Sequence, residues 1–322
     1  MKEIRWGIIG CGKVTEVKSG PGLQQAEGSR LVAVMRRNGE LAEDYARRHN
    51  VPKWYDDADA LINDDEVDAV YIATPPAYHK EYTIAAAKAK KPVYVEKPMA
   101  LNFEECQEMI EACNATSTPL FVAYYRRALP RFLKIKKLLD DKAIGNVKFV
   151  STVQYRKPST VDLAELSWRT DPKIAGGGYF FDVGSHTLDI IDYLLGPIKE
   201  VSGHASNQAG LYPAEDIVTG SYVFESGVHG SGIWCFTAHN GQEMNEIIGD
   251  KGKMSFSTYG TEPVRVLIDG EETFYPIDNP VHIQQPLIQT VVNELLGKGT
   301  CPSTGISAAR TSWVLDKMVG KI

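Results

Sequence analysis

The chain has 322 residues, of which 43% are hydrophobic and 24% are charged, and its formal net charge is −6. This composition excludes a disordered chain, and no apolar run is long enough to predict a segment that spans a bilayer. The length favours two domains, because one hydrophobic core stops growing near this size, and the negative charge gives nucleic acid no general attraction.

The first part of the chain predicts a parallel sheet built from βαβ units, because short β-branched runs alternate with helical patterns. We expect six strands, at residues 4–9, 31–35, 53–55, 69–73, 93–96 and 120–124. Helical patterns lie at residues 40–49, 79–90 and 103–115. Right-handed crossovers would place helices on both faces, and such a sheet binds ligands at the carboxyl ends of its strands.

The pattern changes at Gly145, after a helix that Pro130 opens. Alternation of apolar and polar residues predicts half-buried antiparallel strands at residues 147–155, 217–224, 228–236 and 264–268. Helices are expected at residues 181–195, 284–296 and 307–318. We therefore predict an α/β domain over residues 1–124 and an α+β domain over residues 125–322.

A glycine turn, Gly10-Cys11-Gly12-Lys13-Val14, joins the first expected strand to a helix. Gly10 permits a tight turn, Gly12 lets the backbone approach a pyrophosphate, and the amides of the helix N-terminus would hold its charge. The third position of the motif is Thr15, which leaves less room for close packing than glycine. The context predicts a Rossmann dinucleotide-binding domain, although a glycine turn in any βαβ unit can look similar.

The second expected strand ends at Arg36 and Arg37. Enzymes that use NAD present an Asp or Glu here to the ribose hydroxyls. Two guanidinium groups suit a 2′-phosphate, because arginine offers planar, charge-assisted donors. The cofactor is therefore NADP(H) or NAD(H), with NADP(H) favoured; the alternative is that both arginines are solvated surface residues.

Further motifs stand at later strand ends and in the second domain. They are Ala73-Thr74-Pro75-Pro76-Ala77-Tyr78-His79, Glu96-Lys97-Pro98, Tyr124-Tyr125-Arg126-Arg127, Trp168-Arg169, Gly176-Gly177-Gly178 and Asp182-Val183-Gly184-Ser185-His186. In this order, and with the glycine turn, they resemble the glucose-fructose oxidoreductase, inositol dehydrogenase and rhizopine-catabolism (Gfo/Idh/MocA) family of oxidoreductases.

The resemblance implies that Lys97 lies beside the nicotinamide and the substrate, and that Asp182 and His186 complete the catalytic group. It also implies a second domain with a large, mainly antiparallel open sheet that makes oligomer contacts, in a homodimer or homotetramer. Many relatives carry Asn where this chain has Tyr125, so the resemblance does not fix the detailed substrate contacts.

The catalytic group has the residue types that reversible alcohol oxidation needs, namely an acid/base and a charge stabiliser. Asp182 and His186 are four apart in an expected helix, so they share a face and the carboxylate could orient the imidazole. The alternative is an N-cap aspartate with a core histidine. Asp189 extends the same face. One histidine and two carboxylates are few ligands for a metal ion, so we predict no metal site.

Other candidates have weaker support from the sequence. Thr74, Pro75 and His79 are expected to border the nicotinamide, with a turn and a helix start as the alternative. Glu96 either faces the cofactor or ends its strand as a solvated charge. The remaining candidates are Arg169 for the cofactor and Tyr125, Arg126, Tyr155 and Trp168 for the substrate, with packing or a solvated basic face as the alternative.

The sequence thus predicts an NAD(P)-dependent oxidoreductase that acts on a sugar, polyol or related carbohydrate. Two alternatives stay open: a glycoside-processing enzyme that uses transient oxidation by bound NAD(H), and a non-catalytic cofactor-sensing regulator, which need not keep Lys97, Asp182 and His186. Five scattered cysteines and the lack of a secretory signal favour the cytoplasm, with no metal, nucleic-acid or membrane partner.

Overall fold

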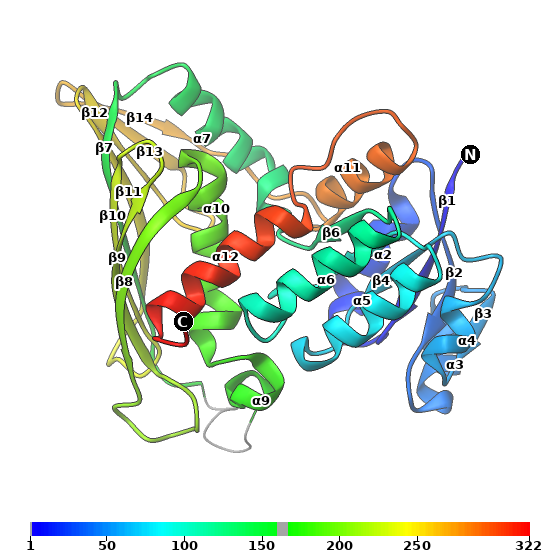
Figure 1. The fold of residues 1–322 in the computed structure, drawn as a ribbon. Coiled ribbons are helices and arrows are strands. Elements are labelled where there is room, and N and C mark those ends of the chain that lie inside the picture. The colour runs from blue at the N-terminus through cyan, green and yellow to red at the C-terminus, as the bar shows by residue number, and fades with distance from the viewer. Residues whose placement is uncertain (1, 160–166) are drawn as a thin grey trace. The chain divides into compact units, whose positions relative to one another are not determined.

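A computed structural model describes residues 2–159 and 167–322 (Figure 1). Contacts between Cα atoms divide the chain into two units, one formed by Met1–Leu129 and Pro280–Ala309, the other by Pro130–Asn279 and Arg310–Ile322. The sequence pattern predicts a single boundary, between residues 124 and 125. In the structure, residues 280–309 belong to the first unit although they follow most of the second unit in the sequence.

Sheet A of the first unit contains all six expected strands, and all of them are parallel. They are β1 (Ile4–Ile9), β2 (Ser29–Met35), β3 (Lys53–Tyr55), β4 (Ala69–Ile72), β5 (Val93–Val95) and β6 (Leu120–Val122). Their order is β3-β2-β1-β4-β5-β6, which confirms the doubly wound α/β fold. Every residue of β4, β5 and β6 is buried, as expected for parallel strands covered on both faces.

The helices of the first unit are α1 (Lys13–Val17), α2 (Ser19–Gln25), α3 (Gly39–Arg48), α4 (Ala58–Ile62), α5 (His79–Lys88), α6 (Phe103–Ala115) and α11 (Gln285–Leu295), with the short turns η1 (Pro76–Tyr78) and η2 (Tyr125–Ala128). Three of these helices, α3, α4 and α6, begin at a side chain that caps them. The side chain of Asn38 accepts a hydrogen bond from the amide of Leu41 at 3.1 Å, and that of Asn102 accepts one from Glu105 at 2.9 Å. These N-caps fix the starts of α3 and α6 close to the expected residues.

Sheet B of the second unit has eight strands in the order β14-β13-β12-β11-β7-β10-β9-β8. They are β7 (Val147–Tyr155), β8 (Ile198–Ser206), β9 (Ile217–Phe224), β10 (His229–Cys235), β11 (Gln242–Gly249), β12 (Gly252–Phe256), β13 (Val264–Ile268) and β14 (Glu271–Tyr275). Only the β7–β10 pair is parallel among them. This confirms the large, mainly antiparallel sheet, although four of its strands were not expected from the sequence.

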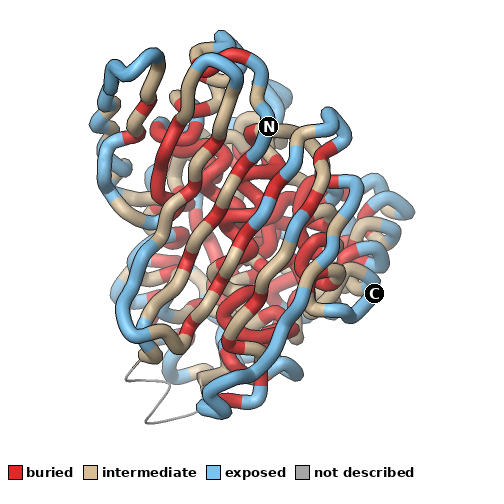
Figure 2. Tube along the Cα trace, turned by 90° about the vertical axis from the view of Figure 1, so that its left-hand side faces the viewer, coloured by how far each residue is buried: buried red, intermediate tan, exposed pale blue. Residues whose placement is uncertain are grey.

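The two faces of sheet B differ in burial. Along β7, Val150, Thr152 and Gln154 are buried, whereas Val153 and Tyr155 on the opposite face are only half-buried. Helices α7 (Pro130–Asp140) and α10 (Ser185–Leu195) lie on the buried side, with the C-terminal part of α12 (Gly305–Met318) (Figure 1). Figure 2 looks onto the opposite face, where exposed and half-buried positions alternate with buried ones along central strands such as β7 and β10.

Within the described part of the chain, no helix is both long and apolar enough to cross a membrane. All five cysteines are free thiols, and four of them are buried.

Candidate active site

The glycine turn after β1 combines one crowded glycine with one open glycine. Gly10 has a φ of +91°, which favours glycine, and a Cβ there would lie 2.8 Å from Cγ2 of Thr74. The turn therefore packs directly against the loop that follows β4. A Cβ at Gly12 would have its nearest neighbour 3.8 Å away, at the carbonyl oxygen of Gly10. The backbone at Gly12 thus borders open space, as close approach of a pyrophosphate requires.

Thr15, at the third position of the motif, closes the start of α1. Its hydroxyl accepts a hydrogen bond from the amide of Gly12 at 2.9 Å and donates one to the Gly12 carbonyl at 2.8 Å. Tight packing is supplied instead by Gly20, where a Cβ would lie 2.2 Å from the carbonyl oxygen of Thr15. The threonine is therefore compatible with the turn, because a later glycine provides the room.

The residues around the glycine turn differ in their exposure. Cys11 is buried, and burial raises the pKa of its thiol to about 11 while the charge of Arg36 opposes the shift. Lys13 is exposed and Val14 is half-buried. Arg36 and Arg37 are both exposed at the end of β2, and the Arg37 guanidinium carbon lies 5.2 Å from the ring centroid of Tyr78 in η1. The Arg36 charge acts on the glycine turn, whereas Arg37 packs on the loop after β4.

The His79 side chain makes hydrogen-bond contacts with both the loop after β4 and the loop after β5. The side chain is fully buried; its Nε2 lies 2.7 Å from the carbonyl oxygen of Thr74, and its Nδ1 lies 3.1 Å and 3.2 Å from those of Pro98 and Met99. Burial lowers the pKa of His79, against the opposing effect of these carbonyls. The ring thus holds Thr74 and the segment that follows Lys97 in fixed positions relative to each other.

Glu96 is a buried carboxylate rather than a solvated strand end. Its Oε1 accepts hydrogen bonds from the Tyr71 hydroxyl at 2.6 Å and from Nε2 of Gln284 at 2.8 Å, and its Oε2 accepts one from the Lys97 amide at 3.2 Å. Gln284 stands at the N-terminus of α11, in the segment that returns to the first unit. No local pattern in the sequence pointed to it.

Lys97 is half-buried directly after β5, and its peptide bond to Pro98 is cis. Lys97 follows β5, which pairs with β4, and the strand order of sheet A reverses between β4 and β1. Pro75 and Thr74 are half-buried, and the Thr74 Oγ1 is buried with no hydrogen-bond partner among the described residues. The open space at the Gly12 backbone and the buried Thr74 hydroxyl that has no hydrogen-bond partner among the described residues fit a dinucleotide bound at the carboxyl ends of the strands of sheet A.

Tyr125 and the two following arginines are buried in the first unit, in η2 after β6. The Arg126 guanidinium carbon lies 4.9 Å from the ring centroid of Tyr125, and Arg127 donates a hydrogen bond to the Pro302 carbonyl at 3.1 Å. Arg127 therefore anchors the returning segment.

The second unit holds Asp182 and His186 at a change of helix type. Asp182 lies in η4 (Phe180–Gly184), a π-helical turn, and His186 lies in the first turn of α10. A π-helical turn is rare and is frequent at functional sites. Arg169 Nε lies 3.3 Å from Oδ2 of Asp182, and the Arg169 guanidinium carbon lies 4.3 Å from the Trp168 ring centroid. The structure thus brings Trp168, Arg169 and Asp182 together within one unit.

His186 is 5% exposed, and its ring centroid lies 5.9 Å from that of Tyr259. Tyr259 follows β12 and was not singled out from the sequence. In the sequence, Tyr259 is an aromatic residue beside Gly260 at a strand end. This is a common turn pattern, so it does not distinguish Tyr259 as a site residue.

The triple glycine before η4 makes room for protein atoms. A Cβ at Gly177 would lie 2.1 Å from the Phe181 ring, and a Cβ at Gly178 would lie 2.5 Å from the carbonyl oxygen of Glu215. Oε1 of Glu215 accepts a hydrogen bond from the Gly178 amide at 2.7 Å, and burial raises the pKa of this carboxyl. Lys321 Nζ donates to the carbonyl of Gly176. These contacts fix the chain that leads into Asp182.

Asp189 is buried on α10 and accepts a long hydrogen bond, 3.4 Å, from the Thr311 hydroxyl. Within residues 2–159 and 167–322, no three His, Cys, Asp or Glu side chains form a group that could hold a metal ion.

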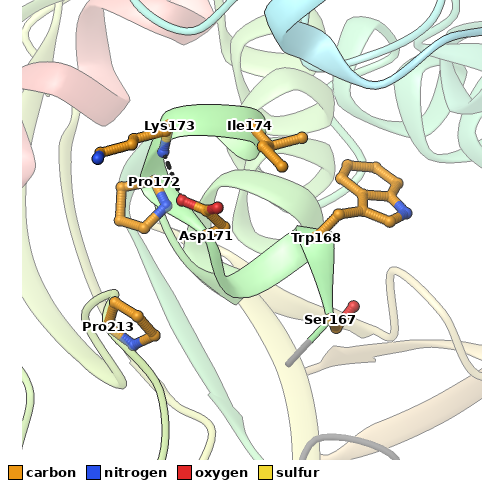
Figure 3. Close-up of a pocket in the computed structure, with 7 residues that line it drawn as sticks. All are labelled: Ser167, Trp168, Asp171, Pro172, Lys173, Ile174 and Pro213. Carbon is orange, nitrogen blue, oxygen red and sulfur yellow. Dashed lines mark hydrogen bonds between the residues drawn. The ribbon is translucent and has the colours of Figure 1, made fainter. Parts of the chain in front are cut away.

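Tyr155 lies on the half-exposed face of β7, and its hydroxyl donates to Oε1 of Gln242 on β11 at 2.8 Å. Trp168, in η3 (Trp168–Thr170), lines a pocket of about 530 Å³ beside α9 (Pro172–Ala175) (Figure 3). This volume is within the range of small-molecule sites. The lining residues are Ser167, Trp168, Asp171, Pro172, Lys173, Ile174 and Pro213.

Comparison with known proteins gives matches along nearly the whole chain. Residues 4–124 match a model of an oxidoreductase family with an NAD-binding Rossmann fold, and residues 132–255 match the GFO/IDH/MocA C-terminal domain. Oxidoreductase P35 of Formosa agariphila is 40% identical over 319 residues, 98% of each chain. A 1,5-anhydro-D-fructose reductase of Ensifer adhaerens is 27% identical over 311 residues, 94% of this chain and 91% of the reductase.

A solved structure of aldose-aldose oxidoreductase from Caulobacter crescentus, complexed with glycerol, is similar to the whole chain. It has a TM-score of 0.87 and 25% identity, and the match covers 98% of this chain and 96% of that one.

Proposed function

Because this chain belongs to the GFO/IDH/MocA family of oxidoreductases, we propose that it transfers a hydride between a nicotinamide cofactor and a carbinol or ketone carbon of a sugar, polyol or related carbohydrate. The observation that carries this proposal is the meeting of three strand ends in the first unit. The turn at Gly10 packs on Thr74, and His79 joins Thr74 to the segment after Lys97. The names of the anhydrofructose reductase and the aldose-aldose oxidoreductase support the carbohydrate class.

At the carboxyl edge of sheet A, the backbone at Gly12 would hold the pyrophosphate of the cofactor, and Thr74 and Lys97 would border its nicotinamide. When bound, the nicotinamide supplies the acceptor or donor of the hydride. Arg36 and Arg37 would contact its adenosine ribose and favour NADP(H), because both guanidinium groups are exposed at the end of β2 and suit a 2′-phosphate.

Lys97 and His186 exchange the hydroxyl proton of the substrate. As the hydride leaves an alcohol carbon, the Lys97 amine or the His186 imidazole accepts this proton; in the reverse direction the same group returns it. Asp182 stabilises the charged imidazole, and Arg169 fixes the Asp182 carboxylate. Tyr125, Arg126 and Trp168 contribute to substrate contacts.

We also infer that the half-exposed face of sheet B forms a homodimer or homotetramer. Val153, Ile233 and Met244 support this inference, because they stand side by side on that face in β7, β10 and β11 and are only half-buried. The five free thiols support a reducing compartment such as the cytoplasm.

A screen of sugars, polyols and their ketones tests the proposed reaction. Absorbance of the reduced cofactor is followed with both cofactors and in both directions. Steady reduction of added NADP⁺ or NAD⁺ by a polyol or sugar is the expected result. Turnover of a glycoside with no net change in the absorbance of a retained cofactor would support the transient-oxidation enzyme instead, and cofactor binding with no turnover of any class would support a sensor.

A further inference from the structure

Tyr259 makes two separate contacts with the segment that carries His186. Its ring lies edge to face with the His186 ring, with 5.9 Å between centroids and 82° between the planes. Its hydroxyl donates a 2.6 Å hydrogen bond to the carbonyl oxygen of Val183 in η4. Tyr259 thus contacts both the imidazole and the π-helical turn that precedes it.

The loop that carries Tyr259, residues 257–262, is held on both sides. Glu243 of β11 accepts hydrogen bonds from the amides of Thr258 at 2.7 Å and Tyr259 at 3.1 Å, and from the Ser257 hydroxyl. Arg131 of α7 is buried and donates to the carbonyls of Gly260 and Glu262. A loop with this many charge-assisted bonds presents Tyr259 in one position.

The same loop also holds the start of α10. The Thr258 hydroxyl lies 3.2 Å from that of Thr187, next to His186 in the chain, and accepts a hydrogen bond from Asn245 Nδ2 at 2.9 Å. Asn245 in turn accepts one from the Thr152 hydroxyl at 2.9 Å. All four side chains are buried, so this chain of hydrogen bonds connects sheet B to the helix turn that presents His186.

We propose that Tyr259 is a positioning residue for His186, and that the 257–262 loop sets the orientation of the imidazole toward the substrate. This inference rests on the proposed function, in which His186 exchanges a proton with the substrate. The Tyr259 ring restricts rotation of the imidazole, and its hydroxyl keeps the π-helical turn closed. Because Tyr259 is 39% exposed, its effect on activity exceeds its effect on stability.

The two contacts can be separated by substitution. Tyr259→Leu removes both, whereas Tyr259→Phe removes the bond to Val183 and keeps the ring beside His186. We expect kcat to fall about tenfold to a hundredfold in Tyr259→Leu and less in Tyr259→Phe, since a small displacement of a reacting group costs rate on this scale. Tyr275→Leu is the matched control. Tyr275 is on β14, its ring centroid lies 4.4 Å from Nζ of Lys134 on α7, and it has no part in the proposed site. Cofactor affinity should be unchanged in all three.

A double-mutant cycle with His186→Ala distinguishes positioning from a general structural effect. If Tyr259 acts through His186, Tyr259→Leu should lower turnover by no more than about twofold further in the His186→Ala background. Two results would overturn the positioning role of Tyr259 and leave the proposed proton transfer intact. One is that the effects of Tyr259→Leu and His186→Ala on turnover are fully additive; the other is that kcat is normal in Tyr259→Leu while His186→Ala is impaired. Normal turnover in His186→Ala would overturn the proposed proton transfer as well.

A spectroscopic measurement does not need the substrate. In protein labelled at histidine, the ring resonance of His186 is identified by its loss in His186→Ala. It should move in Tyr259→Leu, because an aromatic ring at 5.9 Å shifts its neighbours, and stay in place in Tyr275→Leu. An unmoved resonance in a folded Tyr259→Leu would overturn the proposal.

Discussion

The guanidinium group of Arg169 pairs with the carboxylate of Asp182, with 3.3 Å between Nε and Oδ2. The two residues are 13 positions apart in the sequence, on η3 and η4, and the triple glycine lies between them. Arg169 also stacks on Trp168. The arginine therefore links a candidate substrate contact to the carboxylate that follows the glycines.

We expect Arg169→Gln to lower turnover about tenfold, because Asp182 loses the cation that fixes its position. Asp182→Asn should have an effect of similar size and should be milder than loss of Lys97, since the proposed role of Asp182 is to orient and stabilise the imidazole and not to carry the proton. Kinetics and cofactor titration together measure whether Arg169 also binds cofactor. The control is Arg265→Gln, which breaks a similarly exposed ion pair with Glu272 on sheet B; equal losses in both arginine variants would contradict the assignment.

Lys97→Met and His186→Ala should each lower turnover by about 10² to 10⁴, the usual contribution of a general acid or base. Cofactor affinity should change far less, because in the proposed binding mode Gly12 and the arginines after β2 hold the opposite end of the cofactor. Steady-state kinetics are measured beside cofactor titration for each variant. Near-normal turnover in both would remove these residues from the proton transfer.

Arg36→Asp should erode a preference for NADP(H), because the change replaces a cation with the acid that suits the ribose hydroxyls of NAD. The size of the effect is about tenfold or more in the ratio of dissociation constants, as expected for loss of a charge-assisted contact to a phosphate. The matched control is Arg47→Asp, at an exposed position on α3. A titration in which the unmodified protein prefers NAD(H) would defeat the prediction.

Ile233→Lys should dissociate the protein into monomers. Ile233 pairs with Val153 and Thr219 across the centre of sheet B and is only half-buried, so a charge there cannot be covered by a second subunit. Light scattering measures the mass over a range of concentrations. Leu133→Lys, at an exposed position on α7, should leave the mass unchanged. A monomer mass for the unmodified protein at every concentration would rule out the oligomer.

The stability of the first unit should depend on Glu16 at acidic pH. Arg48 donates to Glu16 at 2.7 Å and His49 Nε2 lies 2.6 Å from it, and these partners lower the Glu16 pKa from 4.5 to about 2. A pKa lowered by folding stabilises the protein above the unfolded value and loses this effect as the pH falls toward the folded one. The contribution is at most about 1 kcal/mol, because the pair is partly exposed and screened by solvent.

Thermal unfolding of Glu16→Gln without cofactor checks this prediction. The variant should be less stable than the wild type near neutral pH, and the difference should shrink between about pH 4.5 and pH 2. Glu111→Gln, at an exposed position on α6, provides the comparison. A difference that grows on acidification has the opposite sign and would show that Glu16 is not stabilised by folding.

The strands of sheet A and the glycine turn can be predicted from local sequence patterns. Parallel strands buried on both faces give continuous apolar runs, and β4 and β5 therefore stand out in any short window. The caps at Asn38 and Asn102 act within four residues, so the starts of α3 and α6 are equally local. By contrast, four of the five residues of β14 are exposed, so this strand has no alternation to detect.

The residues that support the site come together through contacts between segments that are distant in the sequence. Glu96 and Gln284 are 188 positions apart, and Tyr259 bonds to Val183 across 76 positions. Neither pair leaves a local pattern, because a buried polar atom needs a partner with the right geometry but not at any fixed spacing in the chain. The sequence thus indicates candidate site residues such as Lys97 and His186. The residues that hold them in position depend on how distant segments pack.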